Sequence, residues 1–388
     1  MEKYKCPLNA TLYRVAYKSY LRGLFMDYIL GRYVKIARYG SGGLVGGGGK
    51  EQYVENLALW ENIIKTAYCF ITPSSYTAAL ETANIPEKDF SNCFRFLKEN
   101  FFIIPGEYNN STENNRYSRN FLHYQSYGAN PVLVQDKLKN AKVVILGCGG
   151  IGNHVSVILA TSGIGEIILI DNDQIENTNL TRQVLFSEDD VGKNKTEVIK
   201  RELLKRNSEI SVSEIALNIN DYTDLHKVPE ADIWVVSADH PFNLINWVNK
   251  YCVRANQPYI NAGYVNDIAV FGPLYVPGKT GCYECQKVVA DLYGSEKENI
   301  DHKIKLINSR FKPATFAPVN NVAAALCAAD VIKFIGKYSE PLSLNKRIGI
   351  WSDEIKIHSQ NMGRSLFALC VEIECEYCKY FICELWSL

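Results

Sequence analysis

The clearest pattern of hydrophobic and polar positions lies between residues 141 and 173. Lys142–Leu146 and Glu166–Ile170 are short, apolar runs rich in β-branched residues, as is typical of buried parallel strands. Between them, Gly-Cys-Gly-Gly-Ile-Gly at 147–152 precedes a helical segment that ends near Ser162. Strand, glycine turn, helix and strand together predict a nucleotide-binding βαβ unit.

The glycine turn and the acid after the second strand give this unit its predicted chemistry. Glycines let backbone N–H groups approach a phosphate at a helix N-terminus, and an acid at a strand end accepts ribose hydroxyls. The residues expected to bind the nucleotide are Gly147, Gly149, Gly150, Gly152 and Asp171. This stretch alone leaves open which nucleotide is bound, and a merely tight turn is the alternative.

Alternating elements follow the βαβ unit. Strands are predicted at 212–217, 233–237, 258–262, 269–276 and 348–357, with helices at 192–207 and 242–256. This alternation predicts an α/β fold built on a mostly parallel sheet.

Residues 26–106 are predicted to form a small separate domain. Helices at 51–70, 74–83 and 86–100 lie between strands at 28–39 and 101–104, as in a winged-helix-like module. The glycine run 40–49 lacks the Lys-Ser/Thr of a phosphate loop and predicts a flexible connection. Such modules bind DNA or peptides, and the lack of a basic recognition helix favours a peptide.

Length and composition bound the whole chain. At 388 residues the chain is long enough for two or three domains, and we expect four parts: an extension (1–25), the small domain (26–106), the α/β domain (107–360) and a cysteine-rich tail (361–388). Lys and Arg balance Asp and Glu at 42 each, so no net charge favours nucleic acid or a membrane. Without an apolar signal core or a long apolar run, we expect a cytoplasmic protein.

Of the twelve cysteines, four lie singly in apolar segments and are expected in the core: Cys69, Cys93, Cys252 and Cys327. Cys282 and Cys285 form a Cys-Tyr-Glu-Cys motif, and Cys375 and Cys378 form a second pair in the tail. In a cytosolic chain, such pairs indicate metal binding before disulfides.

Charged residues gather at the predicted strand ends, where ligands bind in open α/β sheets. They are Asp171, Arg182, Lys195 and Asp239. Lys195 lies in the first turn of a helix, against the helix dipole, which tends to mark function. Cations around phosphates and a carboxylate for Mg²⁺ suit phosphoryl or nucleotidyl transfer, so we expect ATP with Mg²⁺ rather than NAD.

Taken together, these motifs resemble the ubiquitin-activating-enzyme-like adenylating family that includes ThiF and MoeB. The similarity rests on Arg-Tyr-Ser-Arg (116–119), the glycine turn, Asp-Asn-Asp (171–173), Asn-Leu-Thr-Arg-Gln (179–183), Gly-Lys-Asn-Lys (192–195), Asp239 and Cys-Tyr-Glu-Cys (282–285). It implies a Rossmann-like adenylation fold, with the small N-terminal domain as a peptide clamp.

The resemblance also implies roles for single residues. Asp171 would hold the ribose, and Asp239 would bind Mg²⁺. Arg119 would reach the triphosphate of a partner subunit, which makes the active enzyme a homodimer. The expected phosphate and nucleotide contacts are Asp173, Asn179, Arg182, Gln183 and Lys195. Cys282 and Cys285, with Cys375 and Cys378, would form a structural zinc site.

The resemblance is strongest to members that make peptide–nucleotide antibiotic precursors of the microcin C type. It implies adenylylation of the C-terminus of a short ribosomal peptide ending in Asn, with an N–P linkage to AMP and release of pyrophosphate. The alternatives are adenylation of a ubiquitin-like sulfur carrier, an inactive nucleotide-binding regulator and a winged-helix DNA-binding protein. The tail departs from the family pattern, because its CxxC comes late and in an atypical apolar context that suggests a changed reading frame.

Overall fold

The computed structural model describes residues 26–110, 115–285, 306–307, 309–310, 314–351 and 357–361. The expected extension (1–25), most of the chain between 286 and 313, and the tail with Cys375 and Cys378 lie outside the described residues. Two compact units divide the chain, residues 1–134 and 135–388. Helix α6 (Pro131–Lys139) spans the boundary between them. The expected boundary at residue 106 stays a prediction.

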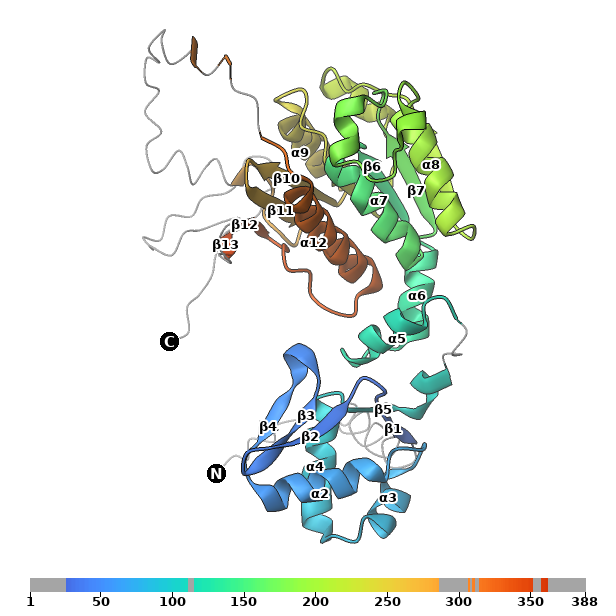
Figure 1. Cartoon of the computed structure of the whole chain (residues 1–388), viewed down its shortest axis with the longest axis vertical. Coiled ribbons are helices and arrows are strands. Elements are labelled where there is room, and N and C mark those ends of the chain that lie inside the picture. The colour runs from blue at the N-terminus through green and yellow to red at the C-terminus, as the bar shows by residue number, and fades with distance from the viewer. Residues whose placement is uncertain are drawn as a thin grey trace, which may run out of the picture. The chain divides into compact units, whose positions relative to one another are not determined.

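The second unit is built on one eight-stranded sheet (Figure 1). Its strands lie in the order β13-β12-β11-β10-β9-β6-β7-β8. Their bounds are β6 (Lys142–Leu146), β7 (Glu166–Ile170), β8 (Ser211–Ile215), β9 (Ile233–Val236), β10 (Tyr259–Val265), β11 (Ile268–Tyr275), β12 (Lys346–Trp351) and β13 (Ile357–Asn361). The five strands from β6 to β10 are parallel, and β11 to β13 extend the sheet in antiparallel pairs. The α/β prediction is therefore confirmed.

The parallel strands have the doubly wound order, with β7 and β8 on one side of β6 and β9 and β10 on the other. The chain leaves β6 through α7 (Gly150–Ser162) toward β7, and β9 continues through α9 (Leu244–Ala255) into β10. Connections that diverge from neighbouring strands open a crevice at their carboxyl ends. The fold thus predicts a ligand site at the ends of β6 and β9.

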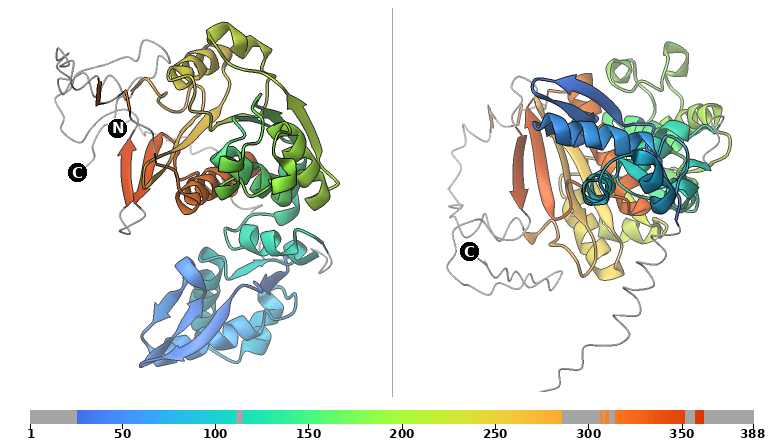
Figure 2. Two further views of the ribbon diagram at one scale, coloured as in Figure 1. Left: turned by 45° about the horizontal axis from the view of Figure 1, so that its top comes forward. Right: turned by 90° about the horizontal axis from the view of Figure 1, so that it is seen from below.

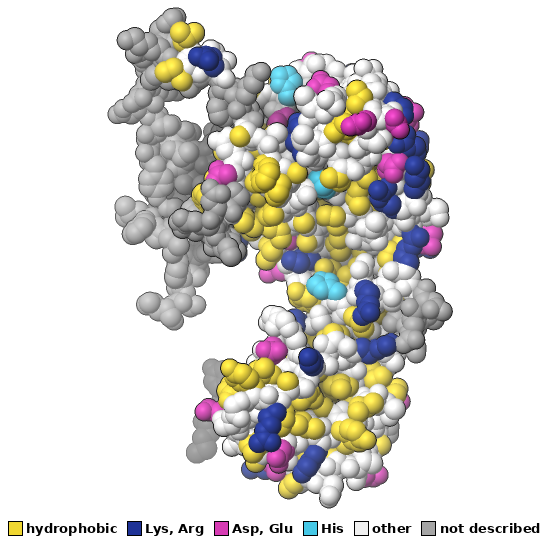
Figure 3. All heavy atoms as spheres, viewed as in Figure 1, with side chains coloured by type: hydrophobic (Ala, Val, Ile, Leu, Met, Phe, Trp, Pro, Cys, Tyr) yellow, Lys and Arg dark blue, Asp and Glu magenta, His cyan; other side chains and the backbone are white. Residues whose placement is uncertain are grey.

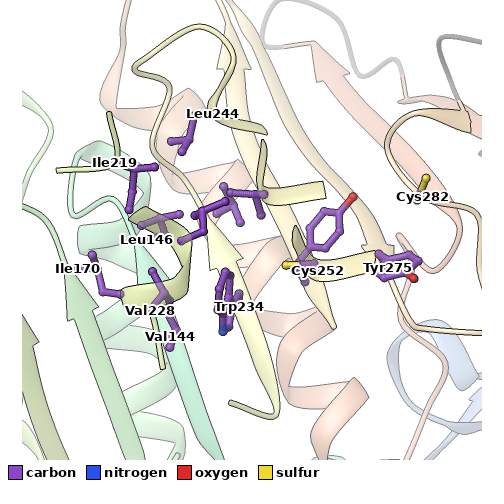
Figure 4. Close-up of a cluster of buried hydrophobic side chains, with 14 of the residues drawn as sticks. Val144, Leu146, Ile170, Ile219, Val228, Trp234, Leu244, Cys252, Tyr275 and Cys282 are labelled. Carbon is purple, nitrogen blue, oxygen red and sulfur yellow. The ribbon is translucent and has the colours of Figure 1, made fainter. Parts of the chain in front are cut away.

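Helices cover both faces of this sheet. Helices α7, α8 (Lys195–Arg206) and α12 (Ala317–Gly336) pack on one face, and α9 with the 3-10 segment Tyr222–Lys227 packs on the other. The second face buries side chains from β6, β7 and β9 with Leu244 and Cys252 of α9 (Figure 4). Because both faces are buried, the parallel strands read as continuous apolar runs.

Helix α12 is apolar enough along its length to cross a membrane, but it is a core helix here. Half of its most apolar 18-residue stretch is buried inside the structure, and the helix packs against α7, β10 and β11. Asp330 within it is fully buried, and its two carboxylate oxygens accept backbone N–H groups of Leu342 and Ser343 at 2.7 Å. The carboxylate ties this helix to the loop that leads into β12. Figure 2 shows β12 and β13 at the end of the sheet.

The first unit has its own hydrophobic core. Helices α2 (Leu57–Tyr68), α3 (Tyr76–Ala83) and α4 (Glu87–Glu99) pack around Phe70, Phe90 and Leu97. β1 (Tyr28–Leu30) pairs with β5 (Ile103–Pro105), and β2 (Lys35–Tyr39), β3 (Gly42–Gly46) and β4 (Gln52–Val54) form an antiparallel sheet. Helix α5 (Ser118–Gln125) also belongs to this unit. Three helices with a small sheet match the expected winged-helix-like module.

The middle of the glycine run is strand β3, and a 3-10 turn (Gly48–Lys50) follows it, so the prediction of a flexible connection at 40–49 was wrong. Strand β3 pairs with both β2 and β4. A Cβ on Gly42 would lie 1.8 Å from the carbonyl oxygen of Val54, and one on Gly43 would lie 2.0 Å from the Trp60 ring. Glycines are needed here because α2 and β4 press directly on the β3 backbone.

Candidate nucleotide-binding site

A pocket of about 1080 Å³ opens in the second unit where the fold predicts a ligand. Its wall includes the glycine turn after β6, the loop after β7, the loop after β9 and the middle of β10. Nearly all the residues predicted from the sequence to bind the nucleotide line it: Gly147, Gly149, Gly150, Asp171, Asp173, Asn179, Arg182, Gln183, Lys195 and Asp239. Residues that the sequence placed at separate strand ends therefore lie together on the wall of one pocket.

The glycine turn presents an uncapped helix N-terminus to this pocket. Gly149 is the N-cap of α7, no side chain caps the helix, and a Cβ there would meet nothing within 4 Å. The free N–H groups of a first helical turn and the helix dipole both favour an anion. This part of the pocket suits a phosphate.

Close packing requires glycine at positions 147 and 152 of the turn. Gly147 has a φ of +94°, and a Cβ there would lie 2.5 Å from the backbone nitrogen of Ala238. A Cβ on Gly152 would lie 2.0 Å from the carbonyl oxygen of Gly147. Gly152 is not among the described residues that line the pocket. It packs the turn, and its direct contact with the nucleotide stays a prediction.

Asp171 is held in place by the backbone on both sides. One oxygen accepts the N–H of Cys148 at 2.6 Å, and the other accepts the N–H of Asp173 at 2.8 Å. The carboxylate thus links the glycine turn to the loop after β7. Burial, followed by the charge of Asp171, raises the pKa of the Cys148 thiol well above its ordinary value, so the thiol stays neutral.

Lys195 and Asp173 form an ion pair across the pocket wall. The lysine is only 6% exposed, and its Nζ lies 2.7 Å from a carboxylate oxygen of Asp173, which is largely exposed. The sequence placed Lys195 at a helix start, where a cation opposes the dipole, and this pair offsets that cost. A bound phosphate would contact the Lys195 ammonium group together with Asp173 or in place of Asp173.

Arg182 and Asn179 both lie in the connection between β7 and α8. Arg182 donates to the carbonyl of Thr178 at 2.9 Å, and its own carbonyl contacts the His154 ring at 3.2 Å. Asn179 accepts the N–H of Glu176 at 3.1 Å. Gln183 is 2% exposed, and its Oε1 is buried without a partner among the described residues. A buried, unpaired acceptor on a pocket wall is typical of a site that a ligand completes.

Asp239 is exposed on the loop after β9 and lines the pocket. No side-chain bond of this carboxylate occurs among the described residues. A carboxylate facing a phosphate site is the usual protein ligand of Mg²⁺ in nucleotide enzymes. Arg119 lies elsewhere: it is exposed on α5 in the first unit and is not among the described residues that line this pocket.

Cys282 and Cys285 lie side by side but outside the pocket lining. Both are buried, and their sulfur atoms are 3.9 Å apart. Two thiolates on one tetrahedral zinc, each about 2.3 Å from the metal, lie about 3.8 Å apart. The pair therefore fits half of a zinc site. Among the described residues, no cluster of three or more His, Cys, Asp or Glu side chains completes it.

Sequence reasoning missed the far wall of the pocket. Asn261 and Tyr264 of β10, Tyr283 between the two cysteines and Arg347 of β12 all line it. Phe242, three residues after Asp239, also lines the pocket and is 91% exposed. Tyr283 lies inside the motif that the sequence singled out for its cysteines, but nothing in the pattern of β12 marked Arg347.

A doubly wound sheet with an uncapped helix N-terminus, cations and carboxylates around one pocket defines a nucleotide-binding protein of the Rossmann type. Comparison with known proteins identifies the family within this class. Residues 117–364 match the ThiF family. The chain belongs to the ThiF family.

Solved structures resemble most of the chain. E. coli MccB with ATP is 94% identical, with a TM-score of 0.84, and the match covers 91% of this chain and all of that one. The microcin C7 biosynthetic enzyme MccB in complex with N-formylated MccA is 95% identical, with a TM-score of 0.84 and the same coverage. Among curated relatives, the sulfur carrier protein ThiS adenylyltransferase of Escherichia coli is 30% identical over 154 residues. That match covers 39% of this chain and 60% of the relative.

Proposed function

We propose that this chain is an ATP-dependent adenylyltransferase that acts on the C-terminus of a short peptide. The observation that carries the proposal is the uncapped start of α7 in a pocket that also holds Arg182, Lys195 and Asp239. Similar proteins support it, since the MccB structures contain ATP or MccA. The product would be a peptidyl-AMP of the microcin C type with an N–P linkage.

Each pocket residue has a proposed role. Asp171 orients the ribose, and the α7 N-terminus with Arg182 and Lys195 stabilises charge on the phosphates. Asn179, Gln183 and Asp173 complete the nucleotide contacts. Mg²⁺, held by Asp239 and phosphate oxygens, would neutralise the leaving pyrophosphate. The terminal group of the acceptor attacks the α-phosphorus, and the bond to the bridging oxygen of pyrophosphate breaks.

The acceptor is the part of the proposal with a specific alternative. The ThiS adenylyltransferase among the relatives favours a ubiquitin-like sulfur carrier. The N-terminal module favours a peptide, because the first unit has a hydrophobic core of its own, and we propose that this unit clamps the peptide. We also propose that the enzyme works in the cytoplasm, where ATP is present.

Pyrophosphate exchange tests the function directly. Purified protein with ATP, Mg²⁺ and synthetic MccA should exchange labelled pyrophosphate into ATP, and Asp239→Ala should lose at least a hundredfold of the rate. Exchange with ThiS-type carriers but not with MccA would select the alternative. Absence of exchange with either acceptor would contradict the enzyme assignment and favour a regulatory or DNA-binding protein.

We further propose a homodimer in which Arg119 of one subunit completes the site of the other. Mixed dimers of Arg119→Ala and Asp239→Ala subunits contain one site with both defects and one site with neither. They should regain activity that neither homodimer has. Intact mixed dimers that stay inactive would contradict the shared site.

A structural zinc ion at Cys282 and Cys285 is the last part of the proposal, with Cys375 and Cys378 as the other ligands. Metal analysis of the purified chain should find one zinc per subunit, and Cys282→Ser should release it and lower thermal stability. Zinc retained in a Cys375→Ser/Cys378→Ser double variant would exclude the tail pair as ligands.

A further inference from the structure

Arg347 is a cation on the pocket wall far from the phosphate residues. Two other cations line the pocket among the described residues. Arg182 belongs to the loop after β7, and Lys195 lies at the start of α8. Arg347 comes from β12, four strand positions from β6 in the sheet. No carboxylate pairs with it among the described residues. A half-exposed guanidinium without an acidic partner is available for a ligand.

Tyr283 holds this guanidinium in one orientation. Arg347 donates to the Tyr283 hydroxyl at 3.3 Å, and its guanidinium carbon lies 5.6 Å from the centre of the same ring. Tyr283 is itself anchored, because its backbone N–H reaches Asn249 Oδ1 at 3.0 Å and the Tyr259 hydroxyl at 3.2 Å. Asn249 and Tyr259 are fully buried. The pair is therefore pre-organised by the core.

Strand register places Arg347 level with the site. Leu146 pairs with Val236, and Val236 pairs with Asn261, so these residues form one row at the carboxyl ends of β6 and β9 and in the middle of β10. The next row joins Ala262 to Phe271 and Phe271 to Ile348. β12 runs in the direction of β10, and Arg347 directly precedes Ile348, so Arg347 lies next to the row of Asn261, beside the bulge between Ile260 and Ala262 of β10. This row leads from the glycine turn toward Arg347.

Distance along this row separates Arg347 from the reacting phosphate. Four strand spacings of about 4.8 Å put β12 about 19 Å from β6. An arginine side chain spans less than half of that distance. The ribose acid Asp171 ends β7, on the opposite side of β6, so the nucleotide extends away from β12. The remaining gap of roughly 10 Å corresponds to about three residues of extended chain.

We propose that Arg347, positioned by Tyr283, binds main-chain carbonyl groups of the acceptor peptide about three residues before its reacting end. The inference rests on the proposed peptide acceptor and adds a specificity subsite to it. A planar guanidinium fork fixed on a ring is suited to carbonyl oxygens, and Asn261 and Tyr264 lie between this subsite and the phosphate site in the pocket wall. Extended peptide laid along this row would carry the terminal group to the α-phosphorus.

Kinetics of Arg347→Ala with MccA of different lengths test the subsite. For full-length MccA, the KM should rise at least tenfold, with kcat within about twofold, because the contact is remote from the chemistry. With a fragment that keeps only the last two residues, Arg347→Ala and the unchanged enzyme should differ less than twofold. Arg347→Lys should not restore the KM, since an ammonium lacks the fork. ATP affinity should stay unchanged in both variants.

Arg254→Ala is the matched control. Arg254 also lies over a tyrosine ring, 6.0 Å from the centre of Tyr222, but it is exposed and not among the described pocket residues. Its removal should leave the KM for MccA unchanged. Circular dichroism melting of each variant reports whether folding is intact.

Three results would overturn the subsite. An unchanged KM for full-length MccA, an equal loss with the two-residue fragment, or a loss of ATP affinity would each contradict it. In all three cases, exchange by the unchanged enzyme would leave the proposed function standing. The failure of the function itself is recognised separately, as absence of exchange with MccA in the unchanged enzyme.

Discussion

The glycines of the turn at 147–152 serve two different physical purposes. Gly147 and Gly152 are required by packing, because a Cβ at either position would overlap backbone atoms of the turn or of the β9 loop. Gly149 has open space around it and an ordinary φ of −72°. Its lack of a side chain therefore bears on the ligand, and a substitution separates the two purposes.

We expect Gly149→Ala to fold with an unchanged melting temperature but to bind ATP at least tenfold more weakly, which is about 1.4 kcal/mol. The added methyl group would stand between the α7 N–H groups and the phosphate. Isothermal titration with ATP and a thermal melt measure the two effects. Gly152→Ala should instead lower the melting temperature. Equal ATP affinity in Gly149→Ala and the unchanged chain would contradict a phosphate at this turn.

Asp190 shows how a single carboxylate responds to pH. It is nearly buried at the end of a 3-10 turn (Glu188–Asp190). Burial by itself raises its pKa, but hydrogen bonds from Lys193, Ser187 and Arg201 outweigh burial and hold the pKa below the ordinary value. Since the folded pKa is depressed, the stabilisation is present above the unfolded pKa and is lost as the pH falls through the folded pKa.

We therefore expect Asp190→Asn to reduce the free energy of unfolding at pH 7 by about 2–3 kcal/mol, because Lys193 and Arg201 lose their contacts with this buried carboxylate. The difference between variant and unchanged chain should shrink below about pH 4, where the carboxyl of the unfolded chain is protonated. Urea unfolding at pH 7 and pH 3.5 measures both values. A difference that is the same at both pH values would exclude this electrostatic origin.

Helix α8 next to Asp190 carries charges of both signs. Lys205, Arg201 and Arg206 all contact Glu202, and the hydrogen bond from Lys205 leads the causes that lower the pKa of Glu202 to about 2. Figure 3 shows dark-blue basic side chains beside acidic ones over the region of α8. Such a mixed, exposed network contributes little to stability. The functional part of this helix is its first turn, where Lys195 faces the pocket.

Helix α12 depends on one buried carboxylate for its connection to β12. We expect Asp330→Asn to reduce the free energy of unfolding by about 2–4 kcal/mol, because the amide NH₂ would face the backbone N–H of Leu342 or Ser343. Chemical denaturation measures the loss. Lys333→Ala is the matched control, because that lysine lies 3.6 Å from Asp330 but supports neither backbone group. A larger loss in Lys333→Ala would show that the ion pair is the stabilising contact.

At the scale of the whole molecule, the chain contains two separately packed cores. Gly43→Ala should destabilise the first unit alone by about 1–3 kcal/mol, because its Cβ would enter the space of the Trp60 ring. Gly49→Ala is the matched control, with nothing within 4 Å of its Cβ. Calorimetry of both variants should show a shift in one unfolding transition for Gly43→Ala only. A single transition that moves as a whole would indicate cooperative units.

The elements of the second unit were largely predictable from the sequence, whereas those of the first unit were less so. Lys142–Leu146 and Glu166–Ile170 were expected and are β6 and β7, because buried parallel strands leave an unmistakable apolar run. The glycine run at 40–49 was read as a loop, because single-residue propensity opposes a glycine strand. Only contact with Trp60 and Val54 requires glycine there. The segment 51–70 was predicted as one helix. It instead begins with strand β4, and helix α2 starts only at Leu57.

The sequence by itself determined the nucleotide half of the pocket, because strand, glycine turn and terminal acid are adjacent in the chain. It also identified Arg182, Lys195 and Asp239, since each lies near the end of a recognisable strand or the start of a helix. The tertiary structure alone decided which residues form the far wall, because β12 meets β10 only through the antiparallel pairing of β11. Arg347 and Tyr283 are 64 residues apart in the chain, and register across the sheet brings them together.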